Sequence, residues 1–458
     1  MDEGLPPGPA EKFGSSDDLL QWLAVHRESY GDIYRASVVG RNVYVVSRPA
    51  YVDHVLRGNW ENYARRGQVV KRISLLLGNG LIASNGSFWV SQRRMIQPAF
   101  TRTAVAGLLD VIKGVNEDLL AHWQRAALAG TAVNVTRDVS TAVLKITLLC
   151  IFGDDYDAVA EFCNVLAEDS ARNMGFAQAF QPLGEIVVRI AMRRRRANAP
   201  GRDILGTLLQ ARDRDRGQPM SDVQLARETM TLIVAGHETT ATALNWIWYL
   251  LSRHPGVEAR LGEELHQRAG TGVPPLETFR KLSYTVKVID EALRLYPPLW
   301  LMTRHAINAD RLGGYFVPAG TEIYISPYLI QHDPGLWQMP DRFDPDRVDN
   351  DPNDADRTDA HAAERAPLSA CPFGAGPRNC IGEFLARTEM QVHLMIIGRE
   401  LRLQYDDPRP AEMVAGMNLL SKGDFLMSPQ LRSKVAEDEP HAHLHEQRVA
   451  DVGGRELR

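Results

Sequence analysis

A single long helix, expected between Ser221 and His254, constrains the fold of this 458-residue chain more than any other feature. Ser221 and Gln224 have the spacing of an N-terminal capping box, and His254-Pro255 is a typical stop signal. At 1.5 Å per residue, this helix would be roughly 50 Å long. Its second half, TALNWIWYLL, is apolar on nearly every side. Such a helix is expected to be buried through the middle of one domain.

The rest of the chain predicts further helices and a smaller number of strands. The run YRASVVGRNVYVVS predicts a hairpin that turns at residues 40–42, and residues 313–326, GGYFVPAGTEIYIS, give a second strand-turn-strand pattern. We therefore predict a mainly α fold with a small β-rich portion, in one domain covering residues 1–458. Flexible tails are expected at about 1–15 and 433–458. Amphipathic patterns predict the other helices at about 104–129, 136–152, 157–172 and 203–213.

The composition excludes several classes of protein. A formal net charge of −5 gives no basis for nucleic acid binding, and four cysteines are too few for a disulfide framework. No run of about 18 apolar residues is present, so we expect no membrane-spanning helix and no integral membrane anchor. The acidic, proline-rich start MDEGLPPGPAEKFGSS does not resemble a signal peptide. We therefore expect a soluble, cytoplasmic protein.

A glycine-rich loop that carries one cysteine, FGAGPRNCIGEFLA, covers residues 373–386. Its glycines and proline predict a rigid turn that lets the backbone approach another group closely. Cys380 precedes a helical pattern, so the helix dipole and the nearby Arg378 are expected to lower its pKa and favour the thiolate. A thiolate serves as a nucleophile or as a metal ligand.

Three kinds of site are compatible with this loop. A nucleophile requires a base, and no histidine lies close to Cys380 in the sequence. A zinc site requires several Cys or His ligands, and Cys371, nine residues away, is poorly spaced for that role. An axial ligand to haem iron requires one cysteine, a loop that admits a flat macrocycle, and cations for the propionates. The local residues fit this third kind of site best.

The pattern F-x-x-G-x-R-x-C-x-G, from Phe373 through Gly376, Arg378 and Cys380 to Gly382, resembles the haem-binding signature of the cytochrome P-450 superfamily. Every defining position is filled, and the motifs that follow keep the family's order over nearly the whole chain. The resemblance implies the cytochrome P-450 fold, with haem b between the long central helix and the cysteine-loop helix. It also implies that Cys380 is the axial iron ligand, that Phe373 covers the thiolate side and that Arg378 contacts a propionate.

The segment AGHETT, residues 235–240, lies midway along the predicted long helix. It places a carboxylate and a hydroxyl in an apolar helix, which is costly unless they are hydrogen bonded or functional. From the residues alone, a local kink with a threonine bonded back to its own helix is an equally good interpretation. The resemblance implies instead that Glu238 and Thr239 relay protons, while Ala235 and Gly236 border the oxygen pocket.

The segment DEALRLYPP contains Glu291 and Arg294, which are three residues apart and share a helix face. By itself such a pair usually belongs to a solvated face. The resemblance implies that the two form the family's E-x-x-R pair, and that Arg342 in MPDRFDPDR completes a buried structural triad. Asp341 stands where this third motif often has Glu.

Further arginines are implied as partners of the haem propionates. The segment FWVSQRR resembles the family's W-x-x-x-R helix, so Trp89 and Arg93 are expected to meet a propionate. An exposed basic pair is the alternative interpretation of Arg93 and Arg94. Arg304 matches another common propionate contact, and Arg378 is the third arginine.

The resemblance implies a haem-thiolate monooxygenase that inserts one oxygen atom from O2 into a lipophilic small molecule, as in secondary metabolism. Electrons are expected from a separate ferredoxin or flavodoxin-type donor with its reductase, so NAD(P)H acts only indirectly. No fused reductase is expected in the 78 residues after Cys380. Arg93, Arg94 and Arg387 are expected to attract the acidic carrier. A peroxide-driven enzyme, a non-catalytic haem-thiolate sensor and a structural protein with a buried Cys380 thiol are the alternatives.

Overall fold

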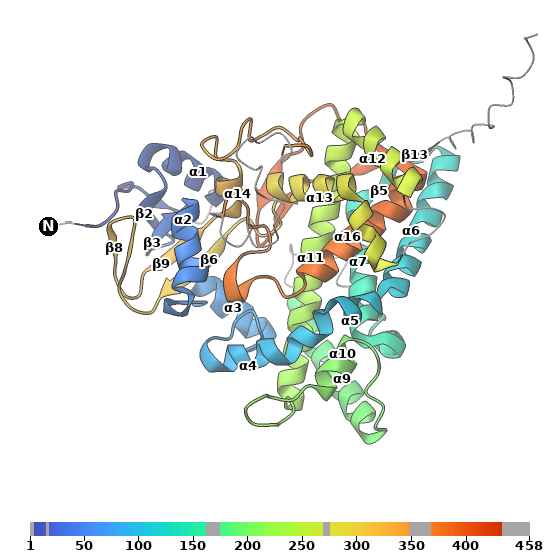
Figure 1. Ribbon diagram of the computed structural model, residues 1–458, viewed down its shortest axis with the longest axis horizontal. Coiled ribbons are helices and arrows are strands. Elements are labelled where there is room, and N and C mark those ends of the chain that lie inside the picture. The colour runs from blue at the N-terminus through green and yellow to red at the C-terminus, as the bar shows by residue number, and fades with distance from the viewer. Residues whose placement is uncertain (1–3, 15–17, 162–174, 269–274, 348–367, 433–458) are drawn as a thin grey trace, which may run out of the picture.

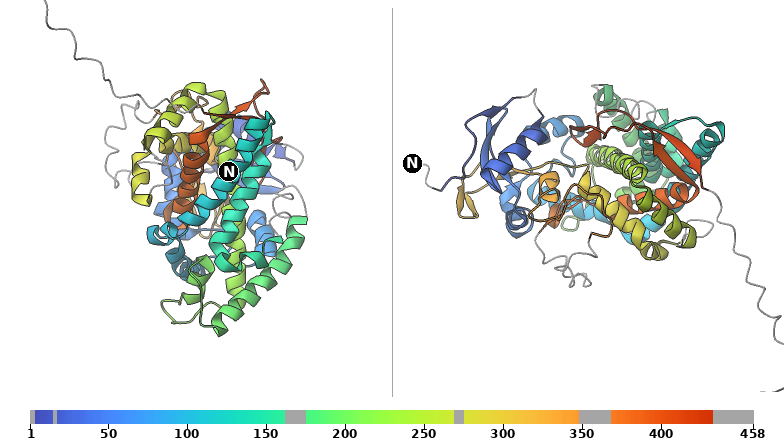
Figure 2. Two further views of the ribbon diagram at one scale, coloured as in Figure 1. Left: turned by 90° about the vertical axis from the view of Figure 1, so that its right-hand side faces the viewer. Right: turned by 90° about the horizontal axis from the view of Figure 1, so that it is seen from above.

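The predicted long helix is present as α11 (Asp222–Arg253) in the computed structural model. The Ser221 hydroxyl accepts a hydrogen bond from the backbone N–H of Gln224, which confirms the predicted N-cap. The Gln224 side chain turns away to Glu228, so only half of the expected capping box forms. Figure 2 shows α11 end-on in its right-hand view, with other elements around it. The structure describes residues 4–14, 18–161, 175–268, 275–347 and 368–432.

Helices surround α11 and bury most of its length (Figure 1). Its packing partners include α7, α9, α13 and α16. A cluster of buried apolar side chains, Trp246 and Trp248 among them, fills the space between these helices. The other helices are α1 (Leu19–Tyr30), α2 (Pro49–Asp53), α3 (Gln68–Leu77), α4 (Gly86–Ile96), α5 (Arg102–Ala106), α6 (Leu109–Ala129), α7 (Val135–Phe152), α9 (Gly175–Arg196), α10 (Ile204–Gln210), α12 (Pro255–Arg268), α13 (Ser283–Leu295), α14 (Pro327–Gln331) and α16 (Glu383–His393).

The strands form small sheets, and the largest lies apart from the helical core, at the left of Figure 1. Its strand order is β1-β2-β3-β9-β6-β4, with β1 parallel to β2 and β3 parallel to β9. A second sheet has the order β10-β13-β5, and β7-β8 and β11-β12 are hairpins. The strands are β1 (Lys12–Phe13), β2 (Ile33–Val38), β3 (Arg41–Val46), β4 (Tyr63–Ala64), β5 (Val133–Asn134), β6 (Met302–Ala306), β7 (Asp310–Leu312), β8 (Tyr315–Val317), β9 (Glu322–Ile325), β10 (Leu401–Tyr405), β11 (Met413–Ala415), β12 (Leu419–Ser421) and β13 (Leu426–Leu431).

The predicted β2–β3 hairpin is confirmed, but its turn lies earlier than residues 40–42. Val38 pairs with Arg41, so Val39 and Gly40 form a two-residue turn with φ of 48° and 74°. Two positive φ angles match the right-handed twist of the flanking strands. Sequence inspection missed this turn because a β-branched residue rarely adopts a positive φ.

The second predicted strand pair, residues 313–326, gives two strands that do not pair with each other. β8 pairs with β7, whereas β9 lies between β3 and β6 in the large sheet. Within the predicted N-terminal tail, Lys12–Phe13 forms β1 against β2 instead. Most of the helix predicted at 157–172, and the tail predicted at 433–458, lie outside the described residues.

The predicted fold class, mainly α with small sheets, is confirmed. Within the described ranges, no helix combines the length and the apolar character that crossing a membrane requires.

Candidate functional site

The cysteine loop is held by its own backbone. The N–H of Cys380 donates to the carbonyl of Phe373 at 2.9 Å, which closes the loop across its neck. Gly376 has φ of +69°, and a Cβ atom there would lie 2.0 Å from the Leu56 carbonyl oxygen. Only glycine allows both this backbone conformation and this close approach. The rigid turn predicted from the glycines is therefore present.

The Cys380 residue is exposed, yet its thiol is largely surrounded by protein. Burial raises its pKa above the usual value, and the Gly382 N–H, Arg93 and Arg65 lower it to a smaller extent. The prediction that a helix end and Arg378 would lower this pKa is therefore wrong for the protein alone. α16 begins only at Glu383, so Cys380 is not in its first turn. The thiol is therefore accessible although protein atoms surround most of it.

α11 has an accessible stripe halfway along its otherwise buried length. Ala235 is exposed, and Glu238 and Thr239 are half-buried, whereas the turns before and after them are buried. Gly236 faces another way, because a Cβ atom there would meet the side chain of Thr147 on α7 at 3.5 Å. Of the two small residues expected at the oxygen pocket, Ala235 lies on the accessible stripe and Gly236 lies against α7.

Glu238 and Thr239 have different partners on this stripe. The Thr239 hydroxyl donates to the Ala235 carbonyl at 2.8 Å, which is the back-bonded conformation expected from the residues alone. Its lone pairs stay free to accept a hydrogen bond. Glu238 Oε2 accepts from Asn418 Nδ2 at 2.7 Å, and its buried Oε1 has no partner among the described residues. Burial raises the pKa of Glu238, and the Asn418 bond lowers it.

Four arginines gather beside the cysteine loop: Arg65, Arg93, Arg304 and Arg378. Arg304 and Arg378 are buried, and burial is the main reason why the pKa of each of the four is lowered. Arg65 and Arg378 add repulsion that lowers the pKa of Arg304 further. In the described part of the chain, none of the four pairs with a carboxylate.

Neutral groups fix the positions of these arginines. Arg93 donates to the backbone carbonyl and side-chain Oδ1 of Asn379 at 2.8 and 2.9 Å. Arg378 donates to Asn85 Oδ1 at 3.2 Å, and its guanidinium carbon lies 4.2 Å from the centre of the Trp89 ring. Asn85 Oδ1 also accepts from the backbone N–H of Arg65 at 2.8 Å. The predicted group of Trp89, Arg93, Arg304 and Arg378 is therefore brought together.

Arg65 was missed by sequence reasoning. It belongs to no motif that we used, and its neighbour Arg66 makes it resemble an exposed basic pair. The strand pair β4–β6 brings it to the site, because Ala64 pairs with His305, next to Arg304. Recognising β4 as a strand of the large sheet would have located it, but β4 has only two residues.

The residues of this region fit haem. Its iron takes a cysteine thiolate as a protein ligand, and metal binding removes the thiol proton despite a raised pKa. Guanidinium groups that have no carboxylate partner in the described part of the protein are suited to pair with the propionate carboxylates of haem. Within the described ranges no cluster of three or more His, Cys, Asp or Glu side chains could hold a metal ion, so the zinc alternative finds no ligand set there.

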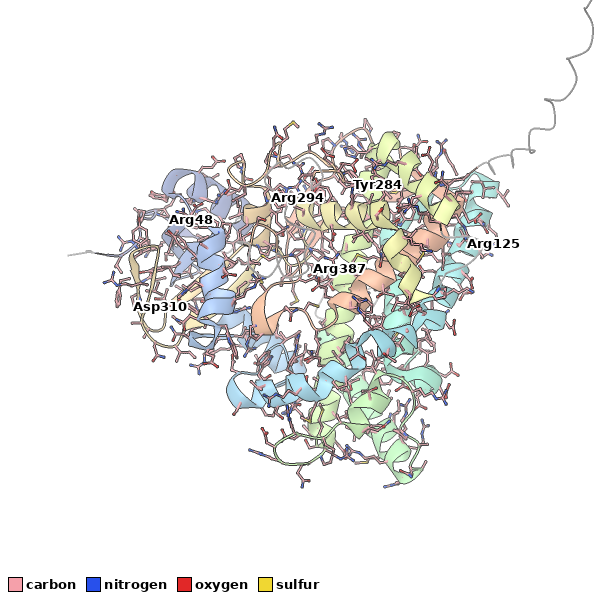
Figure 3. The ribbon with its side chains drawn as sticks, in the orientation of Figure 1. Arg48, Arg125, Tyr284, Arg294, Asp310 and Arg387 are labelled. Atoms are coloured by element: carbon pink, nitrogen blue, oxygen red, sulfur yellow. The ribbon has the colours of Figure 1, made fainter. Side chains whose placement is uncertain are left out.

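The predicted triad forms with a different third member. Glu291 and Arg294, on α13, make two hydrogen bonds at 2.8 and 2.9 Å, and both side chains are buried (Figure 3 labels Arg294). The third side chain is Arg347, whose Nε donates to Glu291 Oε1 at 3.1 Å. Arg342 is exposed and contributes only its backbone carbonyl, which accepts from Arg294 and Arg347.

The sequence explains this error. The segment MPDRFDPDR contains Pro-Asp-Arg twice, and the second copy, ending at Arg347, is the one that reaches Glu291. We expected Asp341 to stand where the family motif often has Glu. Because Arg347 is the arginine that reaches Glu291, the residue at that motif position is Asp346.

The expectation for Arg387 also changes. Arg387, on α16 in the centre of Figure 3, is paired with Asp290 and with Glu383. Its charge is already balanced.

Known proteins resemble this chain over most of its length. The family model described as Cytochrome P450 matches residues 8–181 and 171–427. Cyclooctatin synthase of Streptomyces melanosporofaciens is 33% identical over 411 residues, covering 84% of this chain and 85% of that protein. Cyclooctat-9-en-7-ol 5-monooxygenase of the same organism is 31% identical over 426 residues, covering 88% and 89%. Pentalenene oxygenase of Streptomyces avermitilis is 29% identical over 436 residues, covering 90% and 94%.

A solved structure has the same fold. The crystal structure of the cytochrome P450DA heme domain superposes with a TM-score of 0.81 at 25% sequence identity, covering 94% of this chain and 97% of that one. The mainly helical architecture built around α11 is therefore shared with a structure of known class.

Proposed function

The chain belongs to the cytochrome P450 family and is a monooxygenase, and we propose that it oxidises a lipophilic, terpenoid-like small molecule with electrons from a separate protein donor. One oxygen atom of O2 enters the substrate and the other leaves as water, which consumes two electrons and two protons. The haem, when bound, supplies the oxygen-activating redox chemistry. The observation that carries this proposal is the accessible Cys380 thiol beside four arginines without carboxylates.

The chain's own residues have distinct proposed roles. Cys380 would ligate the iron, and Arg93, Arg304 and Arg378 would bind the propionates together with Arg65. Trp89 supports this group, since its ring lies under the Arg378 guanidinium. On α11, Thr239 would accept a hydrogen bond in the oxygen pocket through its free lone pairs.

Glu238 is the proposed proton donor beside Thr239. Burial raises the pKa of this carboxyl group, so a larger fraction carries a proton near neutral pH than in water. The bond from Asn418 holds the group in place. The proton that it releases is replaced from water.

Two segments that carry exposed apolar side chains are linked to the accessible stripe, and this is consistent with a lipophilic substrate. Leu299 and Met417 are both exposed. Their segments are joined, because Trp300 Nε1 donates to the Gly416 carbonyl at 2.9 Å, and the turn at residues 416–418 also contacts α11 through Asn418. The relatives, a pentalenene oxygenase among them, favour terpenoids within this class.

The test is turnover with isotopically labelled O2 and a panel of terpene hydrocarbons, terpene alcohols, fatty acids and aromatic compounds. We expect terpenoids to shift the haem spin state and to give products that contain one labelled oxygen atom. Fatty acids as the only bound class would contradict the terpenoid assignment. Activity with peroxide alone, and none with a reduced carrier and O2, would favour the peroxide-driven alternative.

An exposed arginine is proposed to help dock the electron donor, a ferredoxin or flavodoxin-type protein reduced by NAD(P)H through its reductase. Arg94 lines an open surface pocket of about 390 Å³ together with Arg93, Asn379 and Pro377. This pocket adjoins the cysteine loop, and a cationic rim attracts acidic proteins.

The docking proposal has a charge-reversal test. Arg94→Glu should slow electron transfer from an acidic carrier roughly tenfold at low salt and reduce its salt dependence. Arg125→Glu, at an exposed site on α6, is the matched control and should leave the rate unchanged. Equal rates for Arg94→Glu and the unaltered protein at every salt concentration would contradict docking at this pocket.

A further inference from the structure

The carboxyl group of Glu238 is held from one side only. Its Oε2 accepts from Asn418 Nδ2 at 2.7 Å, while Oε1 is buried without a partner in the described part of the chain. Such an unpaired buried oxygen is costly, so the group keeps this orientation only where another contact fixes it. Asn418, which is 4% exposed, provides that contact.

Asn418 lies on a turn that is itself fixed. Ala415 pairs with Leu419, so residues 416–418 connect β11 to β12. Trp246 Nε1, from α11, donates to the Leu419 carbonyl at 2.8 Å, and the Leu419 N–H donates to the Pro298 carbonyl at 3.0 Å. These bonds fix the turn to α11 and to the segment before β6. The Asn418 amide therefore approaches Glu238 from a rigid support.

Charged and titratable neighbours do not provide an alternative anchor. On α11, His237 points to Ser140 of α7, with its Nε2 2.9 Å from the serine hydroxyl oxygen. At the end of the hairpin, Lys422 is paired with Glu412. In the described residues, Asn418 is the side chain that hydrogen bonds Glu238.

We propose that Asn418 is a positioning residue that fixes the direction of the Glu238 carboxyl group for proton delivery beside Thr239. This inference rests on the proposed role of Glu238 as proton donor. The role that we assign to Asn418 is exerted through its hydrogen bond to Glu238. An amide N–H stabilises the charged carboxylate more than the neutral acid, so Asn418 also offsets part of the effect of burial on the pKa of Glu238.

The first experiment reads Glu238 without turnover. Infrared difference titration of the haem-loaded protein follows its protonated carboxyl band, identified as the band that Glu238→Gln removes. Asn418→Leu removes the donor in a side chain of similar size and should move the titration midpoint upward by about one pH unit. Should this variant fold poorly, Asn418→Ala makes the same test. Asn418→Gln keeps an amide group, so its titration midpoint should lie closer to that of the unaltered protein than the midpoint of Asn418→Leu does.

The second experiment measures coupling, the amount of product formed per electron pair consumed. Asn418→Leu should lower coupling roughly threefold and raise the solvent kinetic isotope effect, while the substrate Kd stays unchanged. Trp300→Phe is the matched control, since it removes one hydrogen bond to the same turn without touching Glu238. It should leave both the titration and the isotope effect unchanged.

Two outcomes would overturn the inference. One is a Glu238 titration midpoint and a coupling that Asn418→Leu leaves unaltered, while Glu238→Gln lowers coupling. The other is an equal effect of Trp300→Phe, a variant that retains the Asn418 amide. That result would show that the effect of Asn418→Leu comes from a loosened turn and not from the lost amide. A Glu238→Gln variant with unaltered coupling would instead remove the proposed proton donor, while the infrared titration would still report whether Asn418 holds the carboxyl group.

Discussion

Two buried clusters of charge differ in how they are neutralised. In the Glu291 cluster, one carboxylate accepts hydrogen bonds from Arg294, Arg347 and the backbone N–H of Asp344. In the group beside the cysteine loop, guanidinium groups crowd together, and no described carboxylate pairs with them. In the first cluster each guanidinium group has the Glu291 carboxylate as a partner, whereas in the second no guanidinium group has a described carboxylate partner.

The difference indicates what each cluster does. Buried charges that are fully paired hold elements together, here α13 and the segment around residues 342–347. Buried like charges destabilise a protein unless a partner of opposite charge binds. The excess of arginine beside Cys380 therefore has the character of a binding site for an anionic group, and haem with two propionates is such a group.

The largest effect is expected from breaking the paired cluster. Glu291→Gln leaves the buried Arg294 and the half-buried Arg347 without their carboxylate and should cost about 3–5 kcal/mol of unfolding free energy. Arg347→Leu should cost roughly 1–3 kcal/mol, because Glu291 keeps its bonds to Arg294. The measurement is urea unfolding of the haem-loaded protein.

Arg342 provides the matched control for this prediction. Its side chain is exposed, so Arg342→Leu should change stability by less than about 0.5 kcal/mol. A larger loss for Arg342→Leu than for Arg347→Leu would restore the triad predicted from the sequence.

Glu389 provides a third case, a buried carboxyl group that no described arginine pairs with. Glu389 on α16 is buried, its Oε1 has no partner among the described residues, and burial raises its pKa to about 8. Because the folded-state pKa exceeds the unfolded value, Glu389 favours folding at low pH, and this contribution is lost as pH rises from about 4.5 to 8.

Glu389→Gln should therefore flatten the decline of stability with pH. We expect the difference between the variant and the unaltered protein to grow by on the order of 3 kcal/mol from pH 5 to pH 8. Urea unfolding at both pH values measures it, with the exposed Glu117→Gln as control. Parallel curves for Glu389→Gln and the unaltered protein would show that Glu389 is not held neutral.

The smallest of these effects is expected in the arginine group, where the sign should depend on haem. Arg304→Gln removes one of the crowded charges, so the haem-free protein should become slightly more stable. The haem-loaded protein should become less stable, with haem affinity lowered roughly tenfold. Haem transfer to apomyoglobin measures the affinity, and Arg125→Gln is the exposed control. If Arg304→Gln destabilised both the haem-free and the haem-loaded protein, Arg304 would have a structural role like that of Arg294.

Much of the site could be predicted because its residues lie in short motifs. The cysteine loop and AGHETT each form within one local element, so spacing alone relates their side chains. Arg65 and Asn418 could not be found in this way. Arg65 reaches the site because β4 pairs with β6, which lies far away in the sequence. Asn418 lies on a local hairpin, and hydrogen bonds from that hairpin to Pro298 and to Trp246 of α11 bring it to the site.

The fold shows the same difference between local patterns, which the sequence reveals, and contacts between distant segments, which it does not. Long apolar or amphipathic runs predicted α11, α6 and α7, because a helix hydrogen bonds within itself and its period is visible in the sequence. Strand pairing is set by packing between distant segments, and for that reason the pairing of β8 and β9 was not foreseen. The error at Arg342 arose from two copies of one short motif, between which only the folded structure decides.

The central claim, that Cys380 ligates haem iron as a thiolate, is tested by the absorption spectrum of the reduced, CO-bound protein. We predict the red-shifted Soret band of thiolate ligation, and we predict its loss in Cys380→Ser under conditions in which the variant still binds haem. A reduced, CO-bound spectrum without the red-shifted band in the unaltered protein would contradict the account.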